Sequence, residues 1–235
     1  MRKVKCAAVL AAVMMLCGCA RSGEELATTV PPEPVRRVRP RPVAQVREPL
    51  SQEDCIRRVY PDQLRGYYTA LLEQWPEPVY REQGLSPLGA VYTQGDPLVN
   101  VGFALEDLDG DGFRELVIGA IRGREEDPVI LEVWTAPAEE PRRLVCSDRD
   151  RVFYLTDTPA GSTAFLCREG EAWSLLLPEG ETVRQLWRLL PGEKPMLESP
   201  FLPAPVPMPQ GDALISGLRE DLRRVKLYPF YLYTP

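Results

Sequence analysis

The sequence contains no histidine. Serine and cysteine hydrolases usually depend on a histidine base, and many zinc and iron sites are built on imidazole ligands. The chain also lacks a G-x-S-x-G motif, a phosphate-binding P-loop and a dinucleotide fingerprint. Carboxylate-pair chemistry, as in glycosidases, is the catalytic class that these absences leave open. We therefore expect a protein that is not an enzyme.

Cysteine is also scarce, and half of the six cysteines fall within the first 19 residues. The remaining three are Cys55, Cys146 and Cys167, with no C-x-x-C spacing that would predict a metal or redox site. An odd number cannot all pair internally. Two alternatives stay open: a disulfide between Cys146 and Cys167, or three free thiols that pack as small hydrophobic residues.

No stretch reaches the roughly 18 apolar residues of a membrane-spanning helix. The shorter apolar run at the start follows basic residues at positions 2, 3 and 5 and ends in Leu16-Cys17-Gly18-Cys19. This order resembles a bacterial lipobox, in which a small residue precedes the acylated cysteine. The resemblance implies that residues 1–19 are a lipoprotein signal peptide, with lipid on Cys19, because bulky Leu16 disfavours Cys17. We expect a lipid-anchored protein on the extracytoplasmic face of the cell membrane.

Residues 20–50 cannot form a hydrophobic core. Their second half is dominated by prolines at 31, 32, 34, 40, 42 and 49 and arginines at 36, 37, 39, 41 and 47. Such a composition favours an extended polyproline II spacer, whose arginines can also lie on anionic headgroups. We interpret the segment as a linker, with a proline-rich ligand for a partner domain as the alternative.

Charge changes sign at the end of this linker. Residues 1–50 have nine basic and four acidic side chains, so the overall charge of −6 leaves −11 on residues 51–235. Nucleic acid would be repelled by such a domain, because its phosphates have the same sign. We expect no nucleic-acid partner.

Residues 51–235 are long enough for one domain with a core of its own. A capping pattern at Ser51 predicts a helix to Val59, and an apolar stripe predicts a second helix from Pro61 to Trp75. A loop rich in Pro and Gly should follow at 76–98. The predicted strands are 100–106, 115–121, 129–135, 142–146, 151–156, 162–168, 171–177 and 182–189.

Short turns between these strands indicate hairpins, and therefore an antiparallel meander. A second proline-rich loop is expected at 191–210, then a helix at Gly211–Arg224 and a closing strand at Val225–Tyr233. The predicted fold class is α+β, an antiparallel β-meander with N-terminal helices and one C-terminal helix.

One loop has residue types and spacing that require a specific chemistry. Asp107, Asp109 and Asp111 alternate with Leu and Gly, and Glu115 follows, between two strand-like runs. A curled loop would turn these carboxylates toward one centre, together with the backbone carbonyl of Phe113. Oxygen ligands alone suit a hard cation, above all Ca²⁺. An EF-hand is excluded, because its twelfth position would be an isoleucine and a strand follows instead of a helix.

The loop resembles the calcium loop of FG-GAP and VCBS-type repeats, which is strand, D-x-D-x-D-G-x-x-[DE], strand. The resemblance implies Asp107, Asp109, Asp111, Phe113 and Glu115 as ligands of Ca²⁺. Propellers repeat such loops from blade to blade, whereas this chain has it once. The chain is also similar to a broad group of uncharacterised lipoproteins of Gram-positive anaerobes that have one D-x-D-G-D-G-x-x-E-L loop.

These observations predict a tethered, calcium-stabilised, non-enzymatic binding or structural domain. They do not identify its partner, for which an envelope protein and a glycan are both open. The alternative is a carbohydrate- or peptidoglycan-directed binding protein or carboxylate hydrolase. That alternative would use Trp134, Trp173 or Trp187, which lie in or beside predicted strands where core packing also explains them.

Overall fold

The computed structural model describes residues 50–93, 95–121, 128–137, 140–158, 162–190, 196–197, 206–207, 211–220 and 222–235. The predicted signal peptide, its acylation site Cys19 and the linker up to residue 49 lie outside the described residues. In the described part of the chain, no helix has both the length and the apolar character needed to cross a bilayer.

The N-terminal helices begin where the sequence predicts them. Helix α2 (Gln52–Asp54) starts at Ser51, whose Oγ accepts a hydrogen bond from the Asp54 amide at 3.1 Å. It continues as a π-helix, η1 (Cys55–Val59), and Pro61 restarts the chain as α3 (Pro61–Leu72). The buried residues of α3 recur at helical spacing and form one face, consisting of Leu64, Tyr67, Ala70 and Leu71.

The predicted loop at 76–98 is wrong. The structure has helix α4 (Glu77–Glu82), a 3₁₀ helix η2 (Pro87–Thr93) and helix α5 (Pro97–Asn100). Proline was read as a helix breaker, but α4 and α5 each have it in the first turn, where the missing N–H has no helical partner to lose. Asp96 caps α5 by accepting a hydrogen bond from the Leu98 amide at 3.1 Å.

The predicted strands are confirmed with shifts at their ends of a residue or two. They are β1 (Val101–Glu106), β2 (Glu115–Ala120), β3 (Ile130–Thr135), β4 (Arg142–Cys146), β5 (Arg151–Asp157), β6 (Thr163–Glu169), β7 (Ala172–Glu179) and β8 (Thr182–Leu189). All recorded pairs are antiparallel, so the α+β fold class with an antiparallel sheet is confirmed. A separate pair is formed by β9 (Met196–Leu197) and β10 (Val206–Pro207).

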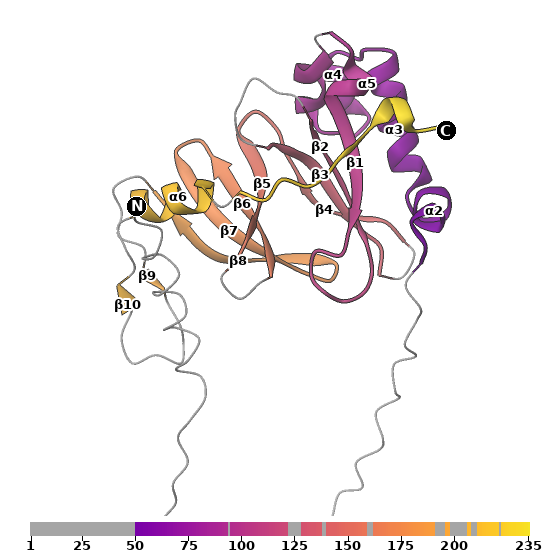
Figure 1. Ribbon diagram of the computed structural model, residues 1–235. Helices are drawn as coiled ribbons and strands as arrows, with labels where there is room; N and C mark the ends of the chain where they lie inside the picture. Colours follow the sequence, from indigo (N-terminus) through magenta and orange to yellow (C-terminus); the bar gives the residue numbers. More distant parts are fainter. Residues whose placement is uncertain are drawn as a thin grey trace, which may run out of the picture.

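The sheet runs in the order β11-β1-β2-β3-β5-β6-β7-β8, with β4 paired to β3 outside this path. Strand β3 shares one edge between two partners: most of it pairs with β4, and Ile130 pairs with Phe153 of β5. The meander therefore turns a corner at β4–β5, and the half formed by β5–β8 lies at an angle to the half formed by β1–β3 (Figure 1).

The C-terminal segment differs from the prediction. Helix α6 (Gly211–Glu220) is present, but the expected strand Val225–Tyr233 is reduced to β11 (Tyr228–Pro229) followed by the 3₁₀ helix η3 (Phe230–Leu232). Proline cannot donate to a sheet ladder, which explains why β11 is short and at the edge. It pairs with β1, and Leu222 forms a bridge with Thr156 of β5, so the segment reaches both halves of the sheet.

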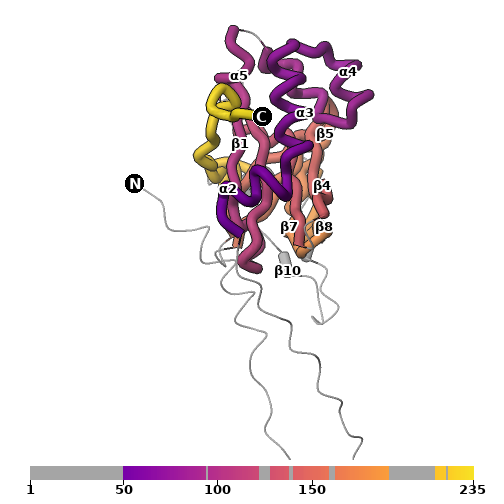
Figure 2. Tube along the Cα trace, turned by 90° about the vertical axis from the view of Figure 1, so that its right-hand side faces the viewer, coloured from indigo at the N-terminus to yellow at the C-terminus, as the bar shows by residue number. Residues whose placement is uncertain are grey.

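Two hydrophobic cores lie on opposite faces of the sheet. The first joins the N-terminal helices to alternate strand residues such as Phe103, Leu116 and Leu131. The second contains strand residues whose side chains point to the other face, such as Val117 and Phe165. The helices lie along the β1–β4 half of the sheet, as the two perpendicular views show (Figures 1 and 2). Central strands buried on both faces explain the nearly continuous apolar runs in the sequence.

The three remaining cysteines are free, and no disulfide joins Cys146 to Cys167. Cys55 and Cys167 are buried and Cys146 is half-buried. Burial raises the pKa of the Cys146 thiol to about 12 and that of Cys167 to about 11. The second of the two alternatives, three free thiols packed as small side chains, is the one that the structure has.

A buried carboxylate joins the helical layer to the sheet. Glu132 of β3 is fully buried, and burial raises its pKa. Its carboxylate accepts hydrogen bonds from the Ser86 amide at 2.5 Å and from Trp134 Nε1 at 2.7 Å, and Arg143 Nη1 lies 3.7 Å away. Ser86 lies between α4 and η2, so this carboxylate fixes that connection on the sheet.

Replacing Glu132 by alanine should lower the free energy of unfolding by about 3 kcal/mol. The Ser86 amide would keep only the Tyr67 hydroxyl as acceptor, Trp134 Nε1 would lose its acceptor, and Arg143 would lose its nearby carboxylate. Denaturant unfolding measures the change. Glu53→Ala is the matched control, since Glu53 forms an exposed i,i+4 ion pair with Arg57 at 3.1 Å and should cost less than about 0.5 kcal/mol. Equal losses in the two variants would contradict the role assigned to Glu132.

Candidate metal centre

The acidic loop connects β1 to β2, and these two strands stay in regular register up to the two ends of the loop. Glu106 of β1 is paired with Glu115 of β2, and residues 107–114 form the connection. Gly110 and Gly112 have φ angles of 78° and 89°, a left-handed conformation that costs glycine nothing and other residues about 1 kcal/mol or more. The two glycines therefore let the loop curl tightly.

The aspartates of the loop bind its own backbone. Each Asp accepts hydrogen bonds from amides two to five residues further on, the pattern of Asx turns. The bonds are Gly110 N to Asp107 Oδ1 (2.8 Å), Gly112 N to Asp107 Oδ2 (3.1 Å), Asp111 N to Asp109 Oδ1 (3.2 Å) and Phe113 N to Asp111 Oδ1 (2.8 Å). These bonds hold the carboxylates on the inside of the curl.

The structure brings together three of the five predicted ligands. Oxygens of Asp107, Asp109 and Glu115 lie within 4.8 Å of one another. Asp111 is outside this group and exposed, although partial desolvation and then the charges of its aspartate neighbours raise its pKa. Phe113 lies in the same loop, and its amide is bonded to Asp111. Asp107, Asp109 and Glu115 are thus the centre of the site.

Glu115 is the buried member of the group, with 2% of its surface exposed. Its Oε2 accepts a hydrogen bond from the Leu108 amide at 2.8 Å, and its Oε1 accepts one from Thr135 Oγ1 at 3.1 Å. Burial, with a smaller contribution from Asp109, raises its pKa to about 7. Sequence analysis missed Thr135, because only the register of β2 against β3 brings the ends of these strands together.

A second element missed by sequence analysis is the turn between β7 and β8. The Gly180 amide donates to Asp109 Oδ2 at 3.1 Å, and Glu181 forms an ion pair with Arg142 of β4 at 2.8 Å. The β7–β8 turn therefore lies against the acidic loop, as Figure 1 shows. Gly180 is a sequence neighbour of no other site residue, so no local pattern points to this contact.

The loop is also anchored from both faces of the sheet. Leu108 is buried in the second core, and the Tyr60 hydroxyl donates to the Arg114 carbonyl at 2.9 Å. These contacts hold the ends of the loop in place while the carboxylates face one another.

This arrangement fits a hard cation. Its donors are carboxylate oxygens, with neither thiolate nor imidazole among them, and Ca²⁺ prefers about six to eight such oxygen ligands. Carboxylates so close together repel one another unless a cation or protons neutralise them. The negative charge and the oxygen donors of the site therefore match Ca²⁺. Asp107, Asp109 and Glu115 would supply the carboxylate ligands.

The tryptophans considered for glycan binding pack against the first core and are half-buried. Trp134 donates its Nε1–H to Glu132 and lies under the Arg143 guanidinium, 5.5 Å from the ring centroid. Trp173 is stacked on Tyr154 with ring centroids 6.2 Å apart. Their contacts are those of side chains at the border of a core.

No family model, no curated protein and no solved structure matches this chain. The geometry described above is therefore the basis for the functional proposal.

In calcium-free solution, stability should fall as pH rises from 5 to 8. The folded-state pKa of Glu115, about 7, is above its ordinary value of 4.5, so the folded protein binds more protons than the unfolded chain in this interval. Deprotonation of Glu115 alone should lower the free energy of unfolding by about 2–3 kcal/mol between pH 5 and 8. Because other groups also titrate, the quantity to measure is the difference in unfolding free energy between wild type and Glu115→Gln, with chelator present. A difference that does not change between pH 5 and 8 would contradict the shift.

Proposed function

We propose that this protein is an extracytoplasmic lipoprotein, anchored to the cell membrane by lipid on Cys19, whose folded part is a non-enzymatic binding or structural domain that holds Ca²⁺ in the loop 107–115. The observation that supports it best is the convergence of Asp107, Asp109 and Glu115 on a loop curled by two left-handed glycines. The lipid anchor is supported by the order of basic, apolar and Leu16-Cys17-Gly18-Cys19 segments.

Calcium in this position would neutralise carboxylates that otherwise repel one another. Asp109 also accepts a hydrogen bond from Gly180, and Glu115 accepts one from Thr135, so a cation on these two residues would also fix the β7–β8 turn and the end of β3. The ion would thus stabilise contacts between parts of the sheet that are distant in sequence. Its role in this proposal is structural.

The predicted partners follow from charge and location. The region after the linker is strongly acidic, which disfavours nucleic acid, and the proposed location leaves an envelope protein or a glycan open as partner. The sequence contains no histidine that a hydrolase could use as base, and the proposal assigns Asp107, Asp109 and Glu115 to the metal centre. The proposal therefore contains no catalytic step.

Titration with calcium, followed by calorimetry and thermal unfolding, tests the metal centre. We expect saturable binding at one site, and at about 100 times the Kd a stabilisation of about 2.7 kcal/mol, or a rise in Tm of roughly 5–10 °C. Asp109→Asn retains an oxygen that can accept from Gly180 but removes one charge. This variant should lose the calcium-dependent rise while its Tm in chelator stays at or above that of wild type.

Asp62→Asn is the matched control, because Asp62 is an acidic residue of α3 whose side chain is 87% exposed. It should respond to calcium as wild type does. The metal centre would be refuted if calcium does not bind at millimolar concentration, or if Asp109→Asn and wild type gain the same stabilisation.

The anchor is tested by fractionation of a bacterium that expresses the full chain. Cys19→Ser should move the protein from the membrane fraction to the soluble fraction, because it removes the thiol that is acylated. Cys17→Ser is the matched control and should leave the protein in the membrane. Retention of the Cys19→Ser protein in membranes after high-salt washing would contradict lipidation at this residue.

A further inference from the structure

The segment that follows α6 differs in charge from the rest of the folded domain. Residues 222–235 contain no acidic side chain and three basic ones, Arg223, Arg224 and Lys226, whereas the region after the linker as a whole has a charge of −11. Arg223 is used within the protein, since its guanidinium lies 3.0 Å from the Glu106 carboxylate. Arg224 and Lys226 are exposed. An acidic domain therefore has one positively charged strip on its surface.

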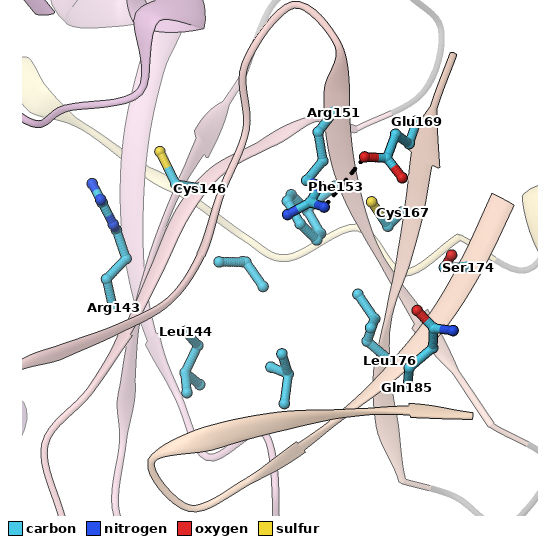
Figure 3. A pocket seen from close by; sticks show the side chains of 12 residues that line it. Arg143, Leu144, Cys146, Arg151, Phe153, Cys167, Glu169, Ser174, Leu176 and Gln185 are labelled. Atoms are coloured by element: carbon cyan, nitrogen blue, oxygen red, sulfur yellow. Dashed lines mark hydrogen bonds and ion pairs between the residues drawn. The ribbon is translucent and has the colours of Figure 1, made fainter. Parts of the chain in front are cut away.

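A hollow of about 310 Å³ between β4 and the β5–β8 half of the sheet illustrates how charge is compensated elsewhere on the domain. At its rim Arg151 forms an ion pair with Glu169 at 3.3 Å, and its walls are otherwise mostly apolar (Figure 3). Lys226 differs from these groups, because it forms no ion pair with any residue that the structure describes. Its charge is available to an anionic partner.

Exposed aromatic and aliphatic side chains lie directly after these cations. Tyr228 of β11 and Tyr231 and Leu232 of η3 are exposed, the last two with 57% and 56% of their surface in solvent. Ile121 is also exposed and lies at the same edge: a Cβ on Gly102 would come within 2.7 Å of Ile121 Cδ1 and 2.6 Å of the Tyr228 carbonyl oxygen. Single exposed hydrophobic residues are ordinary, but several together indicate a contact surface.

The fold directs these side chains outward because the residues between them are held by the two cores. Exposure alternates along the segment, with Val225 and Leu227 packed against the second core and Lys226 pointing to solvent. Phe230 is fully buried in the first core and fixes η3. Figure 1 shows this segment, in yellow, running from α6 along the sheet toward the C-terminus. We call its exposed residues the basic–aromatic strip, which consists of Arg224, Lys226, Tyr228, Tyr231 and Leu232.

The side-chain types of the strip match the surface of a phospholipid bilayer. Basic residues are attracted to anionic headgroups. Tyrosine suits the boundary between headgroups and acyl chains, because it combines an apolar ring with a polar hydroxyl, and leucine buries its side chain in the apolar region. A second copy of the chain is a poorer partner, since a symmetric contact through this strip would bring the same cations together.

The proposed anchor brings the domain to such a surface. Residues 20–49 join the acylation site to the domain at Leu50, and thirty residues span at most about 100 Å. A tether of this reach allows any face of the domain to contact the bilayer, so the anchor alone does not choose one. It also makes docking intramolecular, so that a strip of modest affinity is sufficient.

From these observations we infer that the basic–aromatic strip docks on an anionic phospholipid membrane and holds the domain with this face toward the bilayer. The inference rests on the proposed function, because the lipid anchor supplies the proximity to the membrane. None of the residues of the strip belongs to the metal centre, so docking does not require calcium.

The test is hydroxyl-radical footprinting of the full chain reconstituted in vesicles, with oxidation of individual side chains measured by mass spectrometry. Vesicles of phosphatidylcholine alone are compared with vesicles of equal parts phosphatidylcholine and phosphatidylglycerol. Tyr231 and Leu232 should be oxidised several times more slowly in the anionic vesicles, because docking removes them from water. Leu186 of β8, which is also exposed, is the internal reference and should be oxidised equally in both.

A substitution in the strip tests the role of charge. Lys226→Gln changes an exposed side chain and should fold as wild type does. In anionic vesicles it should lower the ratio of docked to undocked protein about 5-fold, the effect of one basic side chain near an anionic surface. Arg188→Gln is the matched control, because Arg188 is an exposed residue of β8 that pairs with Glu169 at 3.3 Å. It should leave the oxidation of Tyr231 unchanged.

Equal oxidation of Tyr231 in neutral and anionic vesicles would overturn the inference, and so would equal protection in the Lys226→Gln variant and wild type. Slow oxidation that is already present in detergent and is relieved by dilution would show that a second copy covers the strip, which also overturns it. The mass of the N-terminal peptide reports acylation of Cys19 independently. An unacylated chain whose Tyr231 is protected by anionic vesicles would refute the anchor and leave docking supported.

Discussion

The central constraint on this fold is that β1, β2 and β3 are buried on both faces. Helices cover one face, and the other is covered by the turned half of the sheet together with Val225 and Leu227. Strands in this position have nearly no freedom to slip, because a shift of one residue would exchange the side chains of the two cores. The acidic loop connects two such strands, and its ends are therefore among the most firmly held points of the molecule.

Two buried glutamates show how differently the protein treats the same side chain. Glu132 has two N–H donors and a guanidinium near its carboxylate, and it joins the helical layer to the sheet. Glu115 also has two hydrogen-bond donors, but its charged neighbours are aspartates of its own sign. The Glu132 carboxylate has both its hydrogen bonds and its opposite charge from the protein. The Glu115 carboxylate has acidic neighbours, and in the proposed function a cation from solution would supply the positive charge.

The sequence allowed prediction of those features that depend on local patterns. Short apolar runs bounded by turn residues located β1–β8, and the spacing of acidic residues and glycines located the loop and the three carboxylates that converge. Prolines misled the prediction at 76–98. A proline in the first turn of a short helix and a proline in a loop have similar local sequences, because both are flanked by turn-forming and polar residues. The contacts of Thr135 and Gly180 with the acidic loop depend on strand register and on the path of the sheet, which leave no local pattern.

The position of β11 has a consequence for the order of folding. Strand β1 is the first strand of the sheet to be synthesised, whereas its outer partner, Tyr228–Pro229, is at the far end of the described chain. Until that segment arrives, β1 presents an open edge with apolar residues such as Val101 and Phe103. Pairing over such a sequence distance is slow, and open edges recruit other chains. The nascent protein therefore has an interval of aggregation risk that ends only when its last residues dock.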